Sequence, residues 1–117
     1  MHNSDEIRTR ISNSNTNKII VDTDGTNLRD GKWHHVVMTY DGTSSASGVS
    51  VYIDGVISSM KAPIDDTLSA SITNNLPLVL GNKNPTAPGF LDGTMDDIRI
   101  YDYELTGGEI SNLFLIP

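Results

Sequence analysis

The chain contains no cysteine, and this absence excludes several kinds of site. Its 117 residues include no Cys, so no disulfide framework, thiolate metal site or thiol nucleophile is available. The lack of disulfides does not decide the compartment, because a β-sandwich of this size folds without them. The chain is nevertheless long enough to bury the core of one domain, and we expect a single domain over residues 1–117.

Basic residues are also scarce. Eight Lys and Arg residues stand against fifteen Asp and Glu residues, which gives a formal net charge of -7. Because phosphate recognition requires a basic face, this balance argues against a nucleic-acid partner. An acidic surface is compatible with sugars, with cations or with simple solubility.

Long hydrophobic runs are missing as well. No apolar stretch approaches the length that crosses a bilayer, so we expect no membrane span. The first five residues are polar and lack the basic-then-apolar pattern of a signal peptide. If the protein is exported, we expect its signal to have been removed or to lie in a larger parent protein.

The sequence is instead rich in Asp-Gly dipeptides, of which there are five, set between short β-branched and aromatic runs. The clearest is Asp54-Gly55, which separates the runs 49–53 and 56–59. Asp-Gly between two apolar runs is the strongest short hairpin signal, because a type I′ turn requires positive φ at both central residues. The pattern predicts a hairpin with its tip at Asp54-Gly55 and a strand over residues 33–41 beside it.

The remaining segments complete an all-β pattern. Further strands are expected at residues 6–12, 18–22, 76–81 and 94–101, whereas residues 60–69 are expected to form an irregular excursion. Thr106 and Glu109 have the spacing of a capping box, which predicts one short C-terminal helix. About seven strands separated by turn signals predict an antiparallel all-β sandwich of two sheets.

Acidic residues near the last expected strand are the best cation candidates. Asp92, Asp96 and Asp97 could act together with the loop from Asn82 to Asn84, because calcium takes six to eight oxygen ligands. The acids alone supply only part of such a set. The alternative is that Asp92-Gly93 is only a turn and that Asp97 pairs with an arginine, Arg99, two residues later.

Aromatic residues raise the possibility of sugar-stacking platforms. On strands such rings are more often core or cross-strand pairs, so we expect Trp33 in the core. Exposed platforms are expected from loops and strand ends. The candidate ligand-binding residues are therefore Tyr101, Tyr103, Phe90, Asn82 and Asn84.

Two adjacent histidines precede the central apolar run. Because neighbours on a strand face opposite sides of the sheet, His34 and His35 are not expected to bind one metal together. We expect one ring packed in the sandwich, donating to a backbone carbonyl, and the other half exposed. A pH-sensing or ligand role is the alternative.

Six motifs occur in a fixed order over residues 31–114. They are Gly31-Lys32-Trp33-His34-His35-Val36, Thr39-Tyr40-Asp41-Gly42, Val51-Tyr52-Ile53-Asp54-Gly55, Leu78-Val79-Leu80-Gly81, the run from Gly93 to Tyr101, and Leu105-Thr106 with Glu109-Ile110 and Leu113. Together they resemble the laminin-G-like / concanavalin A-like lectin-glucanase superfamily, in particular its bacterial-type laminin-G domains. The order is fairly specific for the fold and much less so for a ligand.

The resemblance implies a jelly roll of two antiparallel sheets that acts as a non-catalytic carbohydrate-binding or adhesion module. It further implies an extracellular or cell-surface location, a glycan or extracellular protein as partner, and calcium as a frequent cofactor. Asp96 matches the acid of the family's final-strand motif, which sometimes helps to hold calcium. Asp97 stands where the family often has Glu.

One departure from the family pattern concerns the N-terminus. Family members usually carry further strands ahead of this region, including a first strand with an Asp-rich turn that helps to bind calcium. Here residues 6–12 align with the middle of the domain, so we expect either that the first strands are missing or that the protein is a natural minimal version of the domain. Because this would expose sheet edges and core, we expect a homo-oligomer formed through exposed strands.

Catalysis is disfavoured by the arrangement of the acids. Glucanases with this fold alternate acids along one strand, and a retaining glycosidase needs two carboxyl groups about 5 Å apart. Asp96 and Asp97 are adjacent and point opposite ways, while Asp102 and Glu104 follow the strand. We therefore predict no enzymatic activity. The alternatives are a structural or self-assembly module without a sugar ligand and, least favoured, a degenerate glycoside hydrolase.

Overall fold

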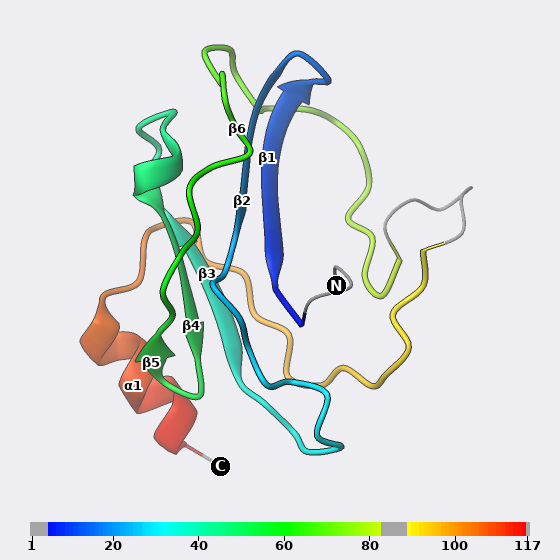
Figure 1. Cartoon of the computed structure of the whole chain (residues 1–117), viewed down its shortest axis with the longest axis vertical. Coiled ribbons are helices and arrows are strands. Elements are labelled where there is room, and N and C mark those ends of the chain that lie inside the picture. The colour runs from blue at the N-terminus through cyan, green and yellow to red at the C-terminus, as the bar shows by residue number, and fades with distance from the viewer. Residues whose placement is uncertain (1–4, 83–88, 117) are drawn as a thin grey trace. The chain divides into compact units, whose positions relative to one another are not determined.

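The computed structural model of the chain describes residues 5–82 and 89–116. It divides into two compact units, which are described separately (Figure 1). The sandwich unit comprises residues 1–72 and 103–117, and the second unit comprises residues 73–102. Every regular element of the described residues lies in the sandwich unit. These elements are β1 (Arg8–Ser14), β2 (Asn17–Asp22), β3 (Val36–Tyr40), the 3-10 turn η1 (Ala46–Gly48), β4 (Val49–Ile53), β5 (Val56–Ile57), β6 (Asp65–Asp66) and α1 (Gly107–Leu115).

The strands form two antiparallel three-stranded sheets, in the orders β1-β2-β6 and β3-β4-β5. The predicted hairpin is confirmed: β4 and β5 pair through Ile53 and Val56 around Asp54-Gly55. Asp54 has φ 51° and Gly55 has φ 81°, so both central residues have the positive φ that a type I′ turn requires. β1 and β2 form a second hairpin, with Arg10 opposite Ile20.

Apolar side chains from both sheets form the core of the sandwich unit. The cluster consists of Ile11, Ile19, Val21, Ala46, Val49 and Leu68. Fully burying a Val or Ile side chain contributes about 1.5–3 kcal/mol, so this cluster is the main favourable term holding the two sheets together. The predicted all-β sandwich of two antiparallel sheets is therefore confirmed.

Helix α1 begins at the capping box that the sequence predicts. Thr106 Oγ1 accepts a hydrogen bond from the backbone N–H of Glu109 at 3.2 Å, and Glu109 Oε2 accepts one from the backbone N–H of Thr106 at 2.7 Å. The helix packs beside β5, where Ser111 Oγ donates to the carbonyl of Gly55. Ile110 is completely buried and anchors it.

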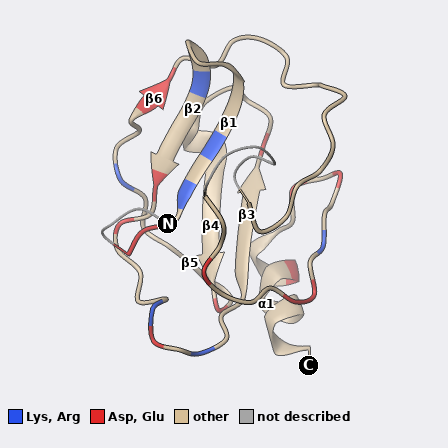
Figure 2. Cartoon of the chain, turned by 90° about the vertical axis from the view of Figure 1, so that its right-hand side faces the viewer, with Lys and Arg blue, Asp and Glu red and all other residues tan. Residues whose placement is uncertain are grey.

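The segment 60–69 is more regular than the sequence predicts. It contains β6, in which Asp65 and Asp66 pair with Ile20 and Ile19 of β2. Two consecutive acids carry no strand signal, so the prediction of an irregular excursion was wrong here. Figure 2 shows the acidic strand β6 beside β2. The one basic residue of β2 is Lys18, and its Nζ lies 3.5 Å from Asp65 Oδ2.

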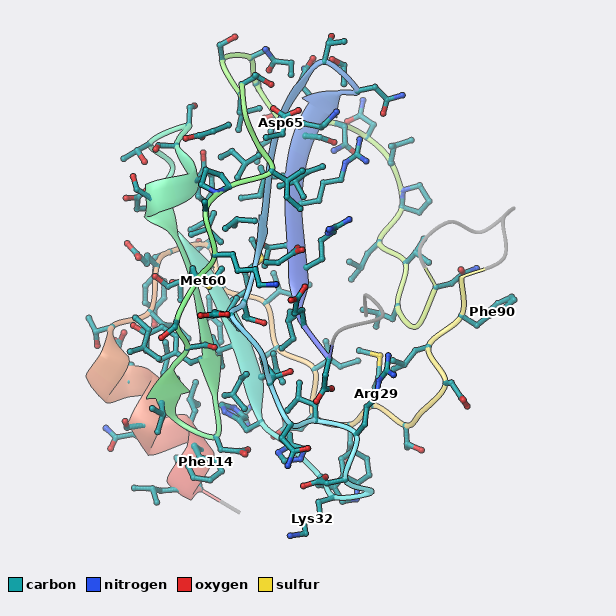
Figure 3. The ribbon with its side chains drawn as sticks, in the orientation of Figure 1. Arg29, Lys32, Met60, Asp65, Phe90 and Phe114 are labelled. Atoms are coloured by element: carbon teal, nitrogen blue, oxygen red, sulfur yellow. The ribbon has the colours of Figure 1, made fainter. Side chains whose placement is uncertain are left out.

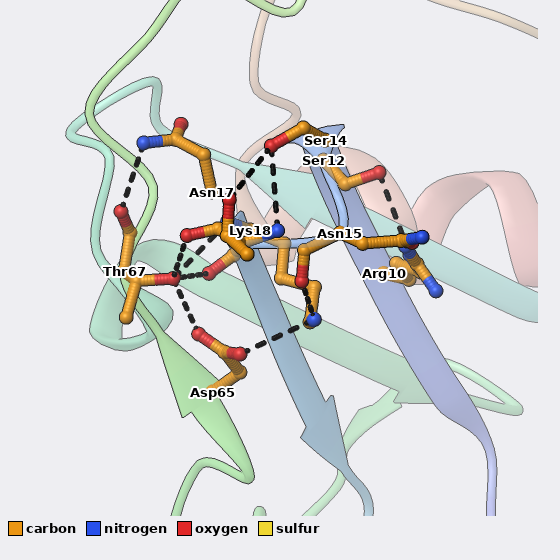
Figure 4. Close-up of polar contacts among 9 residues, drawn as sticks. Arg10, Ser12, Ser14, Asn15, Asn17, Lys18, Asp65 and Thr67 are labelled. Atoms are coloured by element: carbon orange, nitrogen blue, oxygen red, sulfur yellow. Dashed lines mark hydrogen bonds and ion pairs between the residues drawn. The ribbon is translucent and has the colours of Figure 1, made fainter.

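A polar network fastens this segment to the start of β2 (Figure 4). The side-chain oxygen of Asn17 accepts hydrogen bonds from the backbone N–H groups of Ser69 and Ala70, each at 3.0 Å. Its Nδ2 donates to Ser69 Oγ at 2.8 Å and to the carbonyl of Thr67 at 3.3 Å. One amide side chain thus replaces ladder bonds where the short strand β6 ends.

The second unit lacks two strands that the sequence predicts. Neither residues 76–81 nor residues 94–101 form a strand, although both segments are described. In this unit Asn82 and Phe90 form an isolated bridge, and the N–H of Leu91 donates to the carbonyl of Gly81 at 2.8 Å. A strand requires a partner to satisfy its backbone, and an apolar run without a ladder stays irregular.

Helix length bears on the expectation about membranes. Among the described residues, no helix combines the length and the apolar character needed to cross a bilayer.

Candidate functional site

The most organised polar site of the sandwich unit is an imidazole held between two carboxylates, which we call the His34 clasp (Asp30, His34 and Asp54). His34 Nε2 lies 2.9 Å from Asp30 Oδ1, and His34 Nδ1 lies 2.8 Å from Asp54 Oδ2. The side chain of His34 is only 16% exposed. Both ring nitrogens therefore have a carboxylate partner at hydrogen-bond distance.

Local backbone chemistry fixes each carboxylate of the clasp. Asp30 Oδ1 also accepts from the backbone N–H of Lys32 at 2.9 Å, across a turn in which Gly31 has φ 74°. Asp54 Oδ1 accepts from the backbone N–H of His35 at 2.9 Å, and the Asp54 N–H donates to the His35 carbonyl. Aspartate favours such turns because its side chain bonds backbone groups nearby. Two Asp-Gly turns thus present their acids to one ring.

The clasp shifts the pKa values of all three groups. Hydrogen bonds first to Asp54 and then to Asp30 raise the pKa of His34. The bond from His34, together with that from the Lys32 amide, lowers the pKa of Asp30. Burial acts to raise the pKa of Asp54, but its bonds with His34 and the His35 amide outweigh burial and lower it. The site therefore favours an imidazolium between two carboxylates.

The geometry of the clasp does not suit a metal ion. The two carboxylates lie against opposite nitrogens of the same ring, so they do not converge with it on one point. Consistent with this, the part of the chain that the structure describes holds no group of three or more His, Asp or Glu side chains placed to bind a metal.

Trp33 is exposed, and the expectation that it packs in the core was wrong. It is 68% exposed and lies before β3, which begins at Val36 rather than at residue 33. Trp33 lies between the Asp30-Gly31 turn and the first residue of β3, so the alternating burial of strand residues does not extend to it. Its neighbour Lys32 projects away from the ribbon in Figure 3.

The two histidines differ in their surroundings. A bond from one ring to a backbone carbonyl was predicted, but neither ring makes one among the described residues. His34 contacts carboxylates through both nitrogens. The ring of His35 lies against Phe114 of α1, with ring centroids 6.0 Å apart. Its Nδ1 is buried and has no hydrogen-bond partner among the described residues. His35 is therefore the packed histidine, and His34 is the polar one.

The predicted ligand-binding residues are mostly on the surface of their own units. Phe90 is 77% exposed and Tyr101 is 38% exposed in the second unit, and Phe90 extends away from its backbone (Figure 3). Tyr103 is 57% exposed in the sandwich unit. Asn82 forms the bridge with Phe90, while Asn84 lies outside the described residues. Within the second unit, Asn82 and Phe90 are thus brought together.

The predicted metal-binding acids all belong to the second unit and are exposed. Asp97 makes a bidentate ion pair with Arg99, in which Nε donates to Oδ1 at 2.9 Å and Nη2 to Oδ2 at 3.0 Å. This is the alternative that the sequence offered for Asp97. Asp96 Oδ1 accepts from the Asp97 N–H at 2.8 Å. Calcium binding by Asp92, Asp96 and Asp97 remains a prediction.

The His34 clasp was not predicted from the sequence, although the sequence spacing of two of its three residues indicated a contact. Asp30 and His34 are four residues apart in an Asp-Gly turn, a spacing that puts two side chains close when the turn closes. Asp54 is remote in sequence, and only the pairing of β3 with β4 brings it near: Val36 lies opposite Ile53. The hairpin prediction, extended by one residue pair, would have placed Asp54 beside His35.

Comparisons with known proteins agree with this fold. The crystal structure of residues 221–444 of an S-layer domain-containing protein from Clostridium thermocellum is similar, with a TM-score of 0.56 and 23% sequence identity. The match covers 92% of this chain but 63% of that one, so the chain spans less than two thirds of its length. No curated protein sequence matches the chain.

A comparison with protein families identifies the group. Residues 1–111 match the laminin-G-type family that is described as the concanavalin A-like lectin/glucanases superfamily. The match includes both hairpins, the clasp and the start of α1, and it agrees with the two antiparallel sheets. The chain therefore belongs to the concanavalin A-like lectin/glucanase superfamily, as a domain of the laminin-G type.

Proposed function

We propose that this chain is a non-catalytic carbohydrate-binding or adhesion module. The observation that carries the proposal is Trp33, a large aromatic side chain that is 68% exposed on the turn fastened by the clasp. Exposed aromatic groups on a held turn are characteristic of interaction sites, because the ring offers apolar area without further ordering of the backbone. Aromatic faces stack on the C–H faces of sugar rings.

Polar groups next to Trp33 supply what a sugar hydroxyl requires. The Asp30 carboxylate is an acceptor and the Lys32 ammonium is a donor, and both belong to the same turn. Tyr101, Tyr103, Phe90, Asn82 and Asn84 are proposed as further ligand contacts in their own units. A glycan or an extracellular protein is the proposed partner, and the cell surface or extracellular space is the proposed location, which the fold shared with an S-layer domain-containing protein supports.

The state of the acids supports a binding role rather than catalysis. A glycosidase needs one carboxyl group whose raised pKa keeps it protonated as the general acid. Asp30 and Asp54 instead have lowered pKa values, because His34 bonds to both. Asp97 is occupied by Arg99. These carboxylates stabilise the folded structure through their contacts with His34 and Arg99, and such contacts favour the ionised form rather than the protonated form that a general acid requires.

A glycan array with fluorescently labelled protein tests the proposal. We expect binding to a subset of glycans, a strong loss in Trp33→Ala and partial retention in Trp33→Phe. Leu115→Ala is the matched control, because Leu115 is a large side chain of similar exposure, 74%, on α1. An array without binding, or equal binding by Trp33→Ala and the wild type, would contradict the role of Trp33. Phe90→Ala and Tyr103→Ala test the other platforms in the same format.

Calcium is proposed as a cofactor of the acids Asp92, Asp96 and Asp97, which would have to come together around the ion, with Asp97 leaving Arg99. Thermal unfolding with calcium and with a chelator tests this, since an ion that binds only the folded state raises the melting temperature. We expect the calcium-dependent rise to disappear when Asp92 and Asp96 are both changed to Asn. No rise at millimolar calcium would contradict the site. Repeating the array with chelator shows whether sugar binding requires the ion.

Self-assembly through exposed strands is a second candidate function, favoured by strand β3. β3 is at the edge of its sheet, and Val36 and Met38 are 45% and 44% exposed. They lie opposite Ile53 and Val51, on the same face as the completely buried Val51. A second copy pairing along β3 would satisfy the open backbone edge of the sheet and lay a further strand beside Val36 and Met38. Size-exclusion chromatography with light scattering at micromolar concentration tests it: a monomer contradicts assembly, and a dimer abolished by Met38→Lys supports it.

A further inference from the structure

We propose that His34 is a pH-sensitive clasp, which in its protonated form fastens the Asp30-Gly31 turn to the tip of the β4–β5 hairpin and, on losing its proton, releases the turn that carries Trp33. The proposal is independent of any ligand. It concerns how the segment between β2 and β3 is held.

The two contacts of the ring require the imidazolium. A neutral imidazole has one N–H group and one lone pair, so it donates to one carboxylate and turns a lone pair toward the other. His34 has carboxylate oxygens at 2.8 Å from Nδ1 and at 2.9 Å from Nε2. Only the form with protons on both nitrogens makes both contacts favourable. Loss of one proton therefore breaks one of them.

The geometry indicates which contact breaks. Asp54 lies in the tight turn that joins the paired strands β4 and β5. Its other oxygen, Oδ1, accepts a hydrogen bond from the backbone N–H of His35. Asp30 lies in a turn outside any strand and is held by the Lys32 amide two residues away. Because the Asp54 side is the more rigid, neutral His34 keeps its proton on Nδ1 and releases Asp30. The carboxylate of Asp30 is then repelled by the lone pair of Nε2.

Among the described residues, the titratable groups that act on the ring or on its two acids come from the turn, from the hairpin tip and from His35. The turn contributes Asp30 and Lys32, and the hairpin tip contributes Asp54. His35 precedes β3 beside Asp54. From α1 the packed residue is Phe114, which is apolar and lies against His35 and Gly55. Two acids thus face His34 directly, and the pKa of His34 is raised accordingly.

NMR of the ring nitrogens tests the protonation half of the proposal. In 15N-labelled protein we expect His34 to show the imidazolium pattern at pH 6.5 and to titrate above its ordinary pKa of 6.5. At high pH its signals should be those of the Nδ1–H tautomer. Asp30→Asn and Asp54→Asn should each lower the midpoint. Asp41→Asn is the matched control, because Asp41 lies in another Asp-Gly turn that bonds to Thr43 instead, and it should leave the midpoint unchanged.

Trp33, the single tryptophan of the chain, reports the release half. Its emission and anisotropy should change with pH at the NMR midpoint of His34, with lower anisotropy on the alkaline side. The change should vanish in His34→Gln and persist in His35→Gln. A His34 midpoint at or below 6.5 would overturn the clasp. Titration of His34 without any response of Trp33 would overturn the release, and both results are obtained on the wild-type protein.

Discussion

Gly55 lies directly against Phe114: a Cβ built on residue 55 would be 3.1 Å from Cδ1 of the ring. Gly55 also has φ 81°, a conformation that costs an L-residue about 1–2 kcal/mol. Gly55→Ala should therefore destabilise the protein by more than this backbone cost, because the side chain of Phe114 must also move. Chemical denaturation measures the loss as a change in the free energy of unfolding.

Gly42 provides the control for Gly55. It has nearly the same φ, 79°, but a Cβ there would meet no atom within 4 Å. Gly42→Ala should lose about 1–2 kcal/mol from the backbone alone. Equal losses for the two variants would show that Phe114 does not restrict residue 55. In a Phe114→Ala background, the excess loss of Gly55→Ala should disappear.

The capping box of α1 gives a second prediction. Thr106→Ala removes the acceptor of the Glu109 N–H and should destabilise the protein by about 1 kcal/mol. Thr106→Ser keeps the hydroxyl and should remain close to the wild type. Thermal unfolding followed by circular dichroism measures both, and an unchanged melting temperature in Thr106→Ala would mean that the cap is dispensable.

The Asn17 network gives a third prediction. Asn17→Ala removes four hydrogen bonds to residues 67–70, of which Figure 4 shows the one to Thr67, and should cost about 1–2 kcal/mol, since solvent replaces exposed partners. Asn17→Asp keeps the oxygen that accepts from Ser69 and Ala70, so it should lose less. Urea denaturation ranks the variants. Hydrogen exchange of the Ser69 and Ala70 amides should accelerate in Asn17→Ala but not in Asn17→Asp.

The clasp predicts how stability depends on pH. The pKa of His34 is raised, so its contribution is complete below 6.5 and is lost as pH rises through the folded value. The pKa values of Asp30 and Asp54 are lowered, so their contributions are present above 3.8 and are lost as pH falls through the folded values. The clasp should therefore stabilise the fold most between about pH 4 and 6.5.

Urea denaturation from pH 3 to pH 9 measures this profile. His34→Gln should remove the clasp's part of the alkaline decline, whereas His35→Gln should retain it. Identical alkaline slopes in the wild type and His34→Gln would show that the raised pKa of His34 does not couple to folding.

Local signals predicted the elements whose conformation depends on neighbouring residues. Asp54-Gly55 forms the type I′ tip of a hairpin because these residues tolerate positive φ. Thr106 and Glu109 form a capping box because its geometry spans three residues. The ion pair of Asp97 with Arg99 is equally local, and the sequence offered it as an alternative to calcium.

Predictions that depended on distant partners were less successful. β6 consists of two acids and forms because β2 offers a ladder and Lys18 a counter-charge. Residues 76–81 and 94–101 have strong strand patterns, yet neither forms a strand. Trp33 stands at the start of a run of β-branched and aromatic residues that predicts a strand, but it lies on the turn before β3.

The sequence by itself determined a two-sheet β-sandwich with one capped helix, because apolar alternation and turn chemistry act over a few residues. The laminin-G type was implied separately, by the resemblance of six ordered motifs to that family. The tertiary structure alone decided that Trp33 is exposed and that Asp54 meets His34, twenty residues away. The reason is physical: a hydrogen bond between remote side chains exists only after β3 and β4 pair in one register. That pairing adds the Asp54 contact to the local contact with Asp30, and the two together raise the pKa of His34.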